Sequence, residues 1–333
     1  MSDDADINGP SDALKDALGA AQAPLYAVLD GAKFDDLPDL LFDNDFSHKP
    51  LYRDMGSEVR EVAQTTPQFV RFDKWDYWEN ALSPAQRLDA LLEIVDDTSA
   101  AVFWECEGEP KRLFRHLRTI NNVMIPRDAD TPPMPDPLDP EGETFGNTAT
   151  HQQVLFRHAD ANVMAQVLPV LSPKQLTRFM GPAQAVIFAP EEEWLMEGEV
   201  VRIENPKDTY NPNHPLKLSG EDMDAIEARR ANILRYNVMS FLRDMLPDET
   251  EGMIDKDLYD YVVRTESSAE DIGISSLDGL SMWAYLSIRS NETSLTHPKF
   301  REYFGYQLHP NDALIAMSKK IIDMNPVRIE DLL

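Results

Sequence analysis

Four apolar, strand-like runs, each ending in a polar turn, restrict the possible folds of this chain more than any other feature. They are Leu25–Ala32, Thr66–Asp73, His116–Asp128 and Val154–Leu171. Short apolar runs bounded by turn residues are typical of buried strands. The four runs are separated by more than enough residues for intervening helices, so they predict a sheet covered by helices.

Two helix starts lie between and after these runs. Ser83-Pro84-Ala85-Gln86 and Ser172-Pro173-Lys174-Gln175 each place Ser at the N-cap, Pro in the first turn and Gln at the third position. This is a capping box with a proline that the first turn tolerates. Strand candidates follow both helices, at Ala100–Trp104 and Gln184–Ala189. Strands that alternate with short helices favour an α/β or α+β domain with a mixed sheet flanked by helices.

Composition changes along the chain suggest three regions. Residues 1–20 are acidic and read as a flexible tail, or as a short helix over Asp12–Leu18. Residues 21–204 carry the strand and helix signals, interrupted at 126–147 by a proline-rich stretch that predicts an exposed loop. Residues 205–333 repeat apolar side chains at three- and four-residue steps, which predicts a smaller all-α lobe.

The charge excludes some partners. The 333 residues include 31 basic and 59 acidic side chains, a net charge of −28. A field of that sign repels phosphate backbones, so we expect no nucleic-acid partner. It is compatible with simple solubility and with steering of a basic protein partner. The sequence contains no apolar run of membrane-spanning length and no signal-peptide pattern at its start, so we expect a cytoplasmic protein without a membrane partner.

Recognised catalytic and metal-binding patterns are missing from the sequence. A single cysteine, Cys106, excludes an intramolecular disulfide and Cys-x-x-Cys metal sites. Acidic neighbours would raise its pKa, which is unfavourable for a nucleophile. The nucleophile-elbow, P-loop, dinucleotide-binding and zinc-protease motifs do not occur. We therefore predict no enzyme activity, no cofactor and no metal.

Asp30 is the strongest candidate for chemistry that remains. It ends the run YAVLD, the place where some phosphatases keep a nucleophilic Asp, but the second Asp such sites need is replaced by Ala32. Asp30 and Gly31 are instead typical of a turn that closes a strand. The Asp128/Asp130 pair lies in the proline-rich stretch. A hydrolase that uses Asp30 or Asp128/Asp130 stays as an alternative.

Arg157 and Asp160 flank a second turn, from the strand VLFR into a helix that starts at Ala161. Asp160 is placed to cap this helix, and Arg157 to pair with Asp160 or with another carboxylate. We interpret Asp30, Gly31, Arg157 and Asp160 as a structural motif. A direct contact of Arg157 and Asp160 with a partner is the alternative.

Aromatic residues are frequent in the C-terminal lobe. They recur at helical spacing, which is usual for a core, but Trp and Tyr also dominate the energetics of protein interfaces. On the second interpretation, these residues form a partner-binding surface: Trp283, Tyr285, Phe300, Tyr303 and Phe304.

The order of the motifs resembles the DUF4123 family. The resemblance is carried by LYAVLDGA, PLYRDMG (Pro50–Gly56), TPQFVRFD, the helix end HLR and VLFRHADANVMAQVLPVLSPKQLTRFMGP. Family members usually continue the last strand as Arg-Phe-Tyr-Asp-Pro, whereas this chain has Arg157-His158-Ala159-Asp160-Ala161. Arg and Asp are kept, and the aromatic residue and the proline are lost.

The resemblance implies a bacterial adaptor or chaperone for type VI secretion. Such a protein binds the N-terminal region of a cognate secreted effector and helps to load it onto the VgrG spike protein. The family has no catalytic residues to transfer to this chain. A structural subunit associated with the secretion baseplate is a further alternative.

Overall fold

The structure, a computed structural model, describes residues 10–52, 64–72, 82–95, 98–127, 150–194, 200–207, 214–292 and 297–323. The chain divides into two compact units, Met1–Ala228 and Arg229–Leu333. The boundary between them falls within one helix, α8 (Gly220–Met245). It therefore lies further along the chain than the boundary at 204/205 expected from composition.

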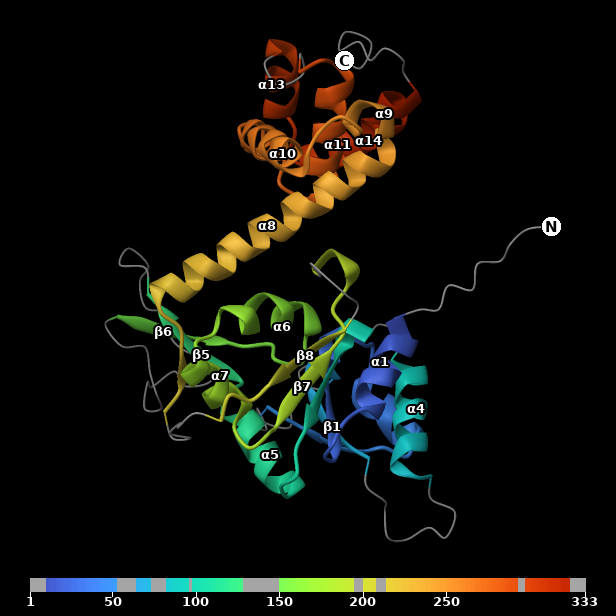
Figure 1. The fold of residues 1–333 in the computed structure, drawn as a ribbon, viewed down its shortest axis with the longest axis vertical. Coiled ribbons are helices and arrows are strands. Elements are labelled where there is room, and N and C mark those ends of the chain that lie inside the picture. The colour runs from blue at the N-terminus through green and yellow to red at the C-terminus, as the bar shows by residue number, and fades with distance from the viewer. Residues whose placement is uncertain are drawn as a thin grey trace, which may run out of the picture. The chain divides into compact units, whose positions relative to one another are not determined.

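A six-stranded antiparallel sheet organises the first unit (Figure 1). Every neighbouring pair of strands in it is antiparallel. In spatial order the strands are β2 (Ser47–Pro50), β3 (Gln68–Arg71), β1 (Leu25–Leu29), β4 (Ala101–Glu105), β7 (Ala185–Phe188) and β8 (Val201–Glu204). The segment expected at Ala100–Trp104 is thus β4, displaced by one residue, and the segment expected at Gln184–Ala189 is β7, which is one residue shorter at each end.

A second, smaller sheet has the order β6 (His151–Leu155), β5 (Asn122–Pro126) and β9 (Leu216–Lys217). Strands β5 and β6 pair antiparallel across the proline-rich stretch, and β5 pairs parallel with β9. Of the two sheets in the described residues, the small one is mixed and the large one is antiparallel throughout. The expected loop at 126–147 lies outside the described residues except for Pro126 and Arg127.

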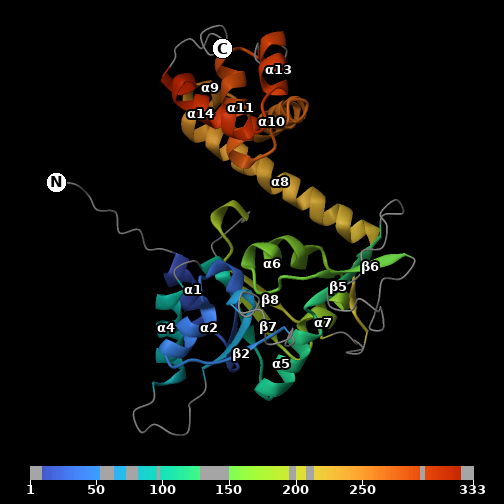
Figure 2. The same ribbon diagram turned by 180° about the vertical axis from the view of Figure 1, so that it is seen from behind.

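Helices cover both faces of the large sheet (Figures 1 and 2). Successive side chains of a strand point to opposite faces, so Ala27 and Leu29 of β1 lie in one apolar cluster and Tyr26 and Val28 in another. The first face packs against α1 (Pro10–Gly19), α2 (Leu37–Asp43) and α4 (Pro84–Ile94). The second packs against α5 (Pro110–Arg118), α6 (Ala161–Val167) and α7 (Pro173–Met180).

Both predicted capping boxes are confirmed. Ser83 accepts a hydrogen bond from the backbone of Gln86, and the Gln86 side chain accepts one from Ser83 N; Ser172 and Gln175 do the same at α7. The predicted helix in the N-terminal region is also present, as α1. Its residues Leu14 and Leu18 are buried in the apolar cluster. The part of residues 1–20 that the structure describes is therefore a packed helix, which corrects the alternative of a flexible tail there.

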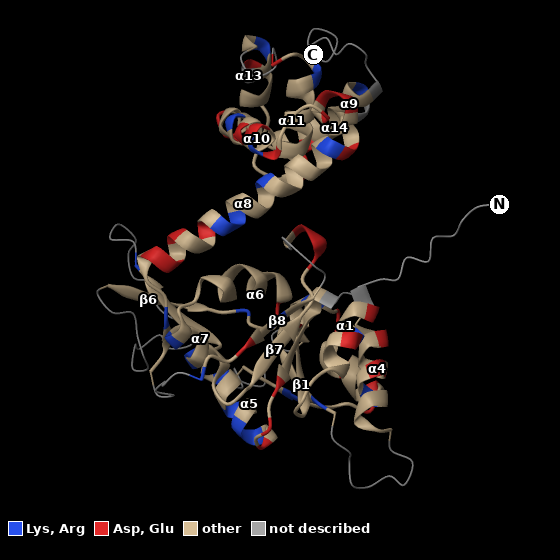
Figure 3. Ribbon diagram, in the orientation of Figure 1, with Lys and Arg blue, Asp and Glu red and all other residues tan. Residues whose placement is uncertain are grey.

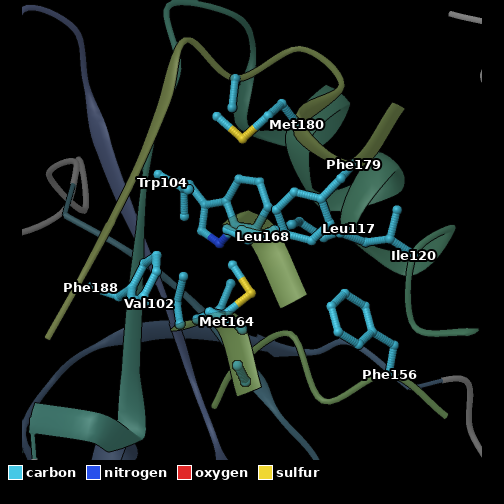
Figure 4. Packing of buried hydrophobic residues seen from close by; sticks show 14 of the residues in the cluster. Val102, Trp104, Leu117, Ile120, Phe156, Met164, Leu168, Phe179, Met180 and Phe188 are labelled. Carbon is cyan, nitrogen blue, oxygen red and sulfur yellow. The ribbon is translucent and has the colours of Figure 1, made fainter. Parts of the chain in front are cut away.

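The second face of the sheet holds the larger part of the core (Figure 4). Trp104 of β4 is fully buried and its ring lies 5.2 Å from that of Phe179 on α7. Phe156 contacts the same Phe179 ring edge-on at 5.9 Å. These rings connect the large sheet, the small sheet and α7, and so they fix the turns that carry the polar residues described next.

The second unit is helical, as the periodicity predicts. Besides the end of α8, its described helices are α9 (Pro247–Thr250), α10 (Asp255–Glu270), α11 (Leu277–Arg289), α13 (Pro298–Gly305) and α14 (Pro310–Asp323). α11 is its most buried helix. The rings of Trp283, Phe300 and Phe304 pack within 6.2 Å of one another in the centre of this unit.

Candidate functional site

A cluster of charged residues lies where β1 ends and α6 begins. The guanidinium of Arg157 donates to the carboxylate of Asp30, and its Nη2 also lies 3.5 Å from a carboxylate oxygen of Asp160. Both carboxylates are nearly inaccessible, whereas the Arg157 side chain is 43% exposed. We call Asp30, Arg157 and Asp160 the Arg157 cluster. The sequence prediction that Arg157 pairs with Asp160 or another carboxylate is confirmed for both partners.

Each carboxylate of the Arg157 cluster also caps a helix. Asp30 accepts from the backbone N–H of Ala32, at the start of the short 3-10 helix Gly31–Lys33. Asp160 accepts from the N–H groups of Asn162 and Val163, as its predicted N-cap role requires. A carboxylate that accepts backbone N–H bonds and an arginine has little oxygen capacity left for other partners.

Position 31 requires glycine because the segment before β3 passes close to its backbone. A Cβ on Gly31 would lie 2.6 Å from the carbonyl oxygen of Thr66 and 2.9 Å from that of Gln64. Backbone atoms cannot move aside as a side-chain tip can. The turn Asp30-Gly31 therefore closes β1 and also lets the chain before β3 pass directly over it.

The charges of the Arg157 cluster shift the pKa values of Tyr52 and of Arg157 itself. Burial and the negative charge of Asp30 raise the pKa of Tyr52 to about 12, although Arg157 acts in the opposite direction. For Arg157, burial alone would lower the pKa, but the charge and hydrogen bond of Asp30 outweigh burial and raise it. Tyr52 therefore stays neutral and Arg157 charged across the physiological range.

A second set of polar residues, Lys33, Ser99 and Glu191, lies next to the Arg157 cluster at the same end of the sheet strands. Lys33 donates to Ser99 and to Glu191, the latter at 3.0 Å, and Ser99 donates to Glu191 at 3.0 Å. Glu191 N also donates to the side-chain oxygen of Asn162, in the first turn of α6. The pKa of Glu191 is lowered because these hydrogen bonds outweigh the effect of its burial. The lysine is thus paired with a carboxylate and also donates to Ser99.

Together these contacts join the end of β1, the residues before β4, the residues after β7 and the start of α6. No group of three or more His, Cys, Asp or Glu in the described part of the chain is arranged to hold a metal ion. Asp128 and Asp130 lie outside the described residues.

Two buried histidines were not identified as a pair from the sequence. His116 donates from Nε2 to the carbonyl of Phe179 (2.8 Å), and His158 donates from Nε2 to the side-chain oxygen of Asn121 (2.9 Å). Burial lowers the pKa of His116 to about 4 and that of His158 to about 3. Burial is also the main reason why the pKa of the Cys106 thiol is raised. At neutral pH both imidazoles are therefore uncharged and the thiol is protonated.

A shallow depression of about 360 Å³ opens between the starts of β6, α7 and α8. In it, Gln175 donates to Asp222 at 2.7 Å and to the carbonyl of Lys217 at 2.9 Å, and Asp222 accepts from Ser219 N. Its polar groups are thus largely occupied by one another. The hydrogen bonds in this depression hold the segments around it together. Its lining therefore presents no converging set of free groups to a ligand.

The aromatic residues predicted to bind a partner are mostly core residues. The side chains of Trp283, Tyr285, Phe300 and Phe304 are each at most 2% exposed. Trp283 also donates from its indole nitrogen to Ser268 at 2.9 Å. As a surface for a partner, the prediction is wrong for these four residues, because the small helical unit needs them to fill its centre. Tyr303 is only partly buried, against the same core.

Apolar side chains are nevertheless exposed in the helical unit. Ten large apolar side chains are exposed among the described residues, and seven belong to residues 229–333, although this unit is the smaller one. Leu308 is 92% and Tyr306 80% exposed, both in the turn between α13 and α14. The seven residues are Tyr236, Met245, Ile254, Tyr306, Leu308, Ile315 and Ile322. Sequence reasoning missed the aliphatic residues among them because single aliphatic residues in helical periods cannot be assigned to a face without the packing.

Comparison with known proteins gives no relative: no family model, no curated protein and no solved structure matches this chain. Among the helices that the structure describes, none combines the length and the hydropathy needed to cross a membrane.

Proposed function

We propose that this protein is a non-enzymatic, cytoplasmic bacterial adaptor that binds the N-terminal region of a cognate type VI secretion effector and helps to load it onto the VgrG spike. The proposal starts from the resemblance of its motif order to the DUF4123 family. Asp30, Gly31, Arg157 and Asp160, which belong to those motifs, hold one turn and one helix start together. Their role in the adaptor is to support the fold.

The observation that carries the proposal is the concentration of exposed apolar side chains in the helical unit. Contiguous exposed apolar surface in a monomer usually marks a site for another protein. Ile315 and Ile322 are seven residues apart on α14, which places them on the same face of that helix. Leu308 and Tyr306 precede the same helix and are more exposed than any other large apolar residues described. We assign effector binding to this surface: Tyr306, Leu308, Ile315 and Ile322.

The hydrolase alternative is weaker because Asp30 is not free to act. Its carboxylate is paired with Arg157 and caps a turn, and a nucleophilic carboxylate must instead face a substrate. A baseplate subunit would share the exposed surface but not the dependence on an effector. Stoichiometry in the assembled apparatus separates the two roles, since a baseplate subunit remains there without any effector.

Co-purification tests the proposal. The full chain is co-expressed with a type VI effector encoded beside its gene, and Leu308→Asp is compared with Phe42→Asp. Phe42 is 74% exposed on α2 of the other unit, so it is a matched control for placing a charge on exposed apolar surface. We expect Leu308→Asp to lose the effector and Phe42→Asp to retain it. Equal retention by both variants would remove the assignment to the helical unit.

A further inference from the structure

One helix of this acidic protein carries a continuous positive face. Within its nine residues α5 has Lys111, Arg112, Arg115 and Arg118 and no acidic residue. At 100° per residue these four side chains fall on one arc of the helix, opposite the buried Leu113 and Leu117. Figure 3 shows the resulting concentration of basic residues on α5.

An aromatic ring lies at the edge of this positive face, beside Arg118. Phe114 is only partly buried, and the guanidinium carbon of Arg118 lies 5.7 Å from its ring centre. Lys49, from the edge strand β2, lies 6.0 Å from the same ring centre. Cations at these distances interact favourably with the ring face. We define the α5 cationic surface as Lys49, Lys111, Arg112, Arg115 and Arg118 around Phe114.

The cations of this surface are not neutralised within the described part of the chain. The ion pairs found there use seven other basic residues: Lys33, Arg157, Arg202, Arg235, Arg243, Lys256 and Arg264. Acidic residues outnumber basic ones by 59 to 31, so a carboxylate partner would be easy to supply. Glu107 and Glu109 precede the helix and are exposed, and neither forms an ion pair with these cations.

The positive face is also held rigidly. Leu113 and Leu117 are fully buried in the core beneath it, and His116 on the same helix donates to the carbonyl of Phe179. Fixing the backbone in advance lowers the entropy cost of binding, because only the long side chains remain to be ordered.

We propose that the α5 cationic surface binds a short acidic segment of a partner protein, with an apolar side chain of that segment against Phe114. A short segment gains the local attraction of the five cations. A nucleic acid would bring a long row of phosphates against a protein of net charge −28, which is repulsive beyond the surface itself. The inference does not depend on the adaptor function, because it rests on a different unit and on charge rather than exposed apolar area.

Fluorescence anisotropy with a labelled peptide of alternating Asp and Glu around one central Leu tests this inference on the full chain. Lys111→Glu/Arg115→Glu is compared with Lys299→Glu/Lys320→Glu, which makes the same change in charge at exposed lysines of the helical unit. We expect the α5 variant to bind at least about tenfold more weakly and the control to change by less than about threefold. Lys49→Glu, on β2, should also weaken binding, and added salt should weaken binding of the unaltered protein.

Three outcomes overturn the inference. One is the absence of peptide binding by the unaltered protein at low salt. Another is equal weakening by the α5 variant and the control, which would make net charge the cause. The third is tighter binding of a single-stranded oligonucleotide of equal charge that the α5 variant abolishes. Thermal unfolding of each variant confirms that it is folded before binding is compared.

Discussion

Arg157 and Asp30 form an ion pair between residues 127 positions apart in the chain, and the carboxylate of the pair is only 3% exposed. This pair fixes the end of β1 against the start of α6, because Arg157 also lies 3.5 Å from the N-cap Asp160. It explains why an isolated Asp at the end of an apolar strand has a structural role here. Breaking the pair is destabilising mainly because it would leave a buried carboxylate without its cation.

Arg157→Met should lower the free energy of unfolding by about 1–3 kcal/mol, because Asp30 would be left buried and unpaired. The exposed position of Arg157 keeps the value below that of a fully buried pair. Urea denaturation measures the change. In an Asp30→Asn background the same substitution should cost less than half as much, since a neutral amide needs no cation. Equal costs in both backgrounds would show that the pair is not the source of the effect.

Gly181→Ala should destabilise the first unit by about 2 kcal/mol or more. Gly181 ends α7 with φ +55°, and a Cβ there would lie 2.3–2.4 Å from the ring of His116. Gly108→Ala is the control, because a Cβ on Gly108 has no neighbour closer than 3.7 Å. Chemical denaturation compares the two variants. Similar stability of both would contradict the close packing of Gly181 on the histidine ring.

Acidification should destabilise the protein from about pH 6.5 downward. The pKa values of His116 and His158 are lowered to about 4 and about 3, so the unfolded state, with a histidine pKa of about 6.5, binds their protons more readily. Stability is therefore lost as the pH falls from the unfolded pKa toward the folded ones. Between pH 6.5 and 5.5, above the usual range of carboxylates, the loss from both histidines is about 2 kcal/mol.

Urea unfolding at several pH values, together with the histidine NMR signals of the folded protein, checks this dependence. Two of the histidine signals should not titrate between pH 7 and 5. Constant stability over that interval, with all histidines titrating near pH 6.5, would contradict the buried positions of His116 and His158.

Trp283→Ala should destabilise the helical unit by about 3–5 kcal/mol, since its fully buried ring contacts Phe300 and Phe304 and its indole nitrogen donates to Ser268. Tyr306→Ala, at an 80% exposed residue of the same unit, should change stability by less than about 0.5 kcal/mol. Thermal unfolding separates these cases. A small effect of Trp283→Ala would restore this residue as a candidate for the partner surface.

Local signals in the sequence predict much of the fold. Ser83 and Ser172 mark their helices correctly because a capping box needs only four neighbouring residues. Asp160 caps α6 for the same reason. Fold class and the helical C-terminal unit follow from periodicity, which is also a local property.

Contacts between segments that are far apart in the sequence cannot be predicted from such local signals. Strand β3 lies between β1 and β2 in an antiparallel sheet, and no periodicity within a strand specifies its neighbours. Arg157 lies only three residues before Asp160, so that contact is predictable, whereas nothing in the sequence singled out Asp30 among the other carboxylates as its second partner. The aromatic residues of α11 and α13 were misassigned because helical spacing identifies one face and does not say whether that face meets a core or a partner.

Binding of the effector by the Leu308→Asp variant tests the central claim most directly, since Leu308 is 92% exposed and its replacement should leave the fold intact. Size-exclusion chromatography of the chain co-expressed with its neighbouring type VI effector gives the measurement. The account predicts that the unaltered chain and Phe42→Asp elute with the effector and that Leu308→Asp elutes alone at unchanged thermal stability. Elution of the unaltered chain without the effector, under the same conditions, would contradict it.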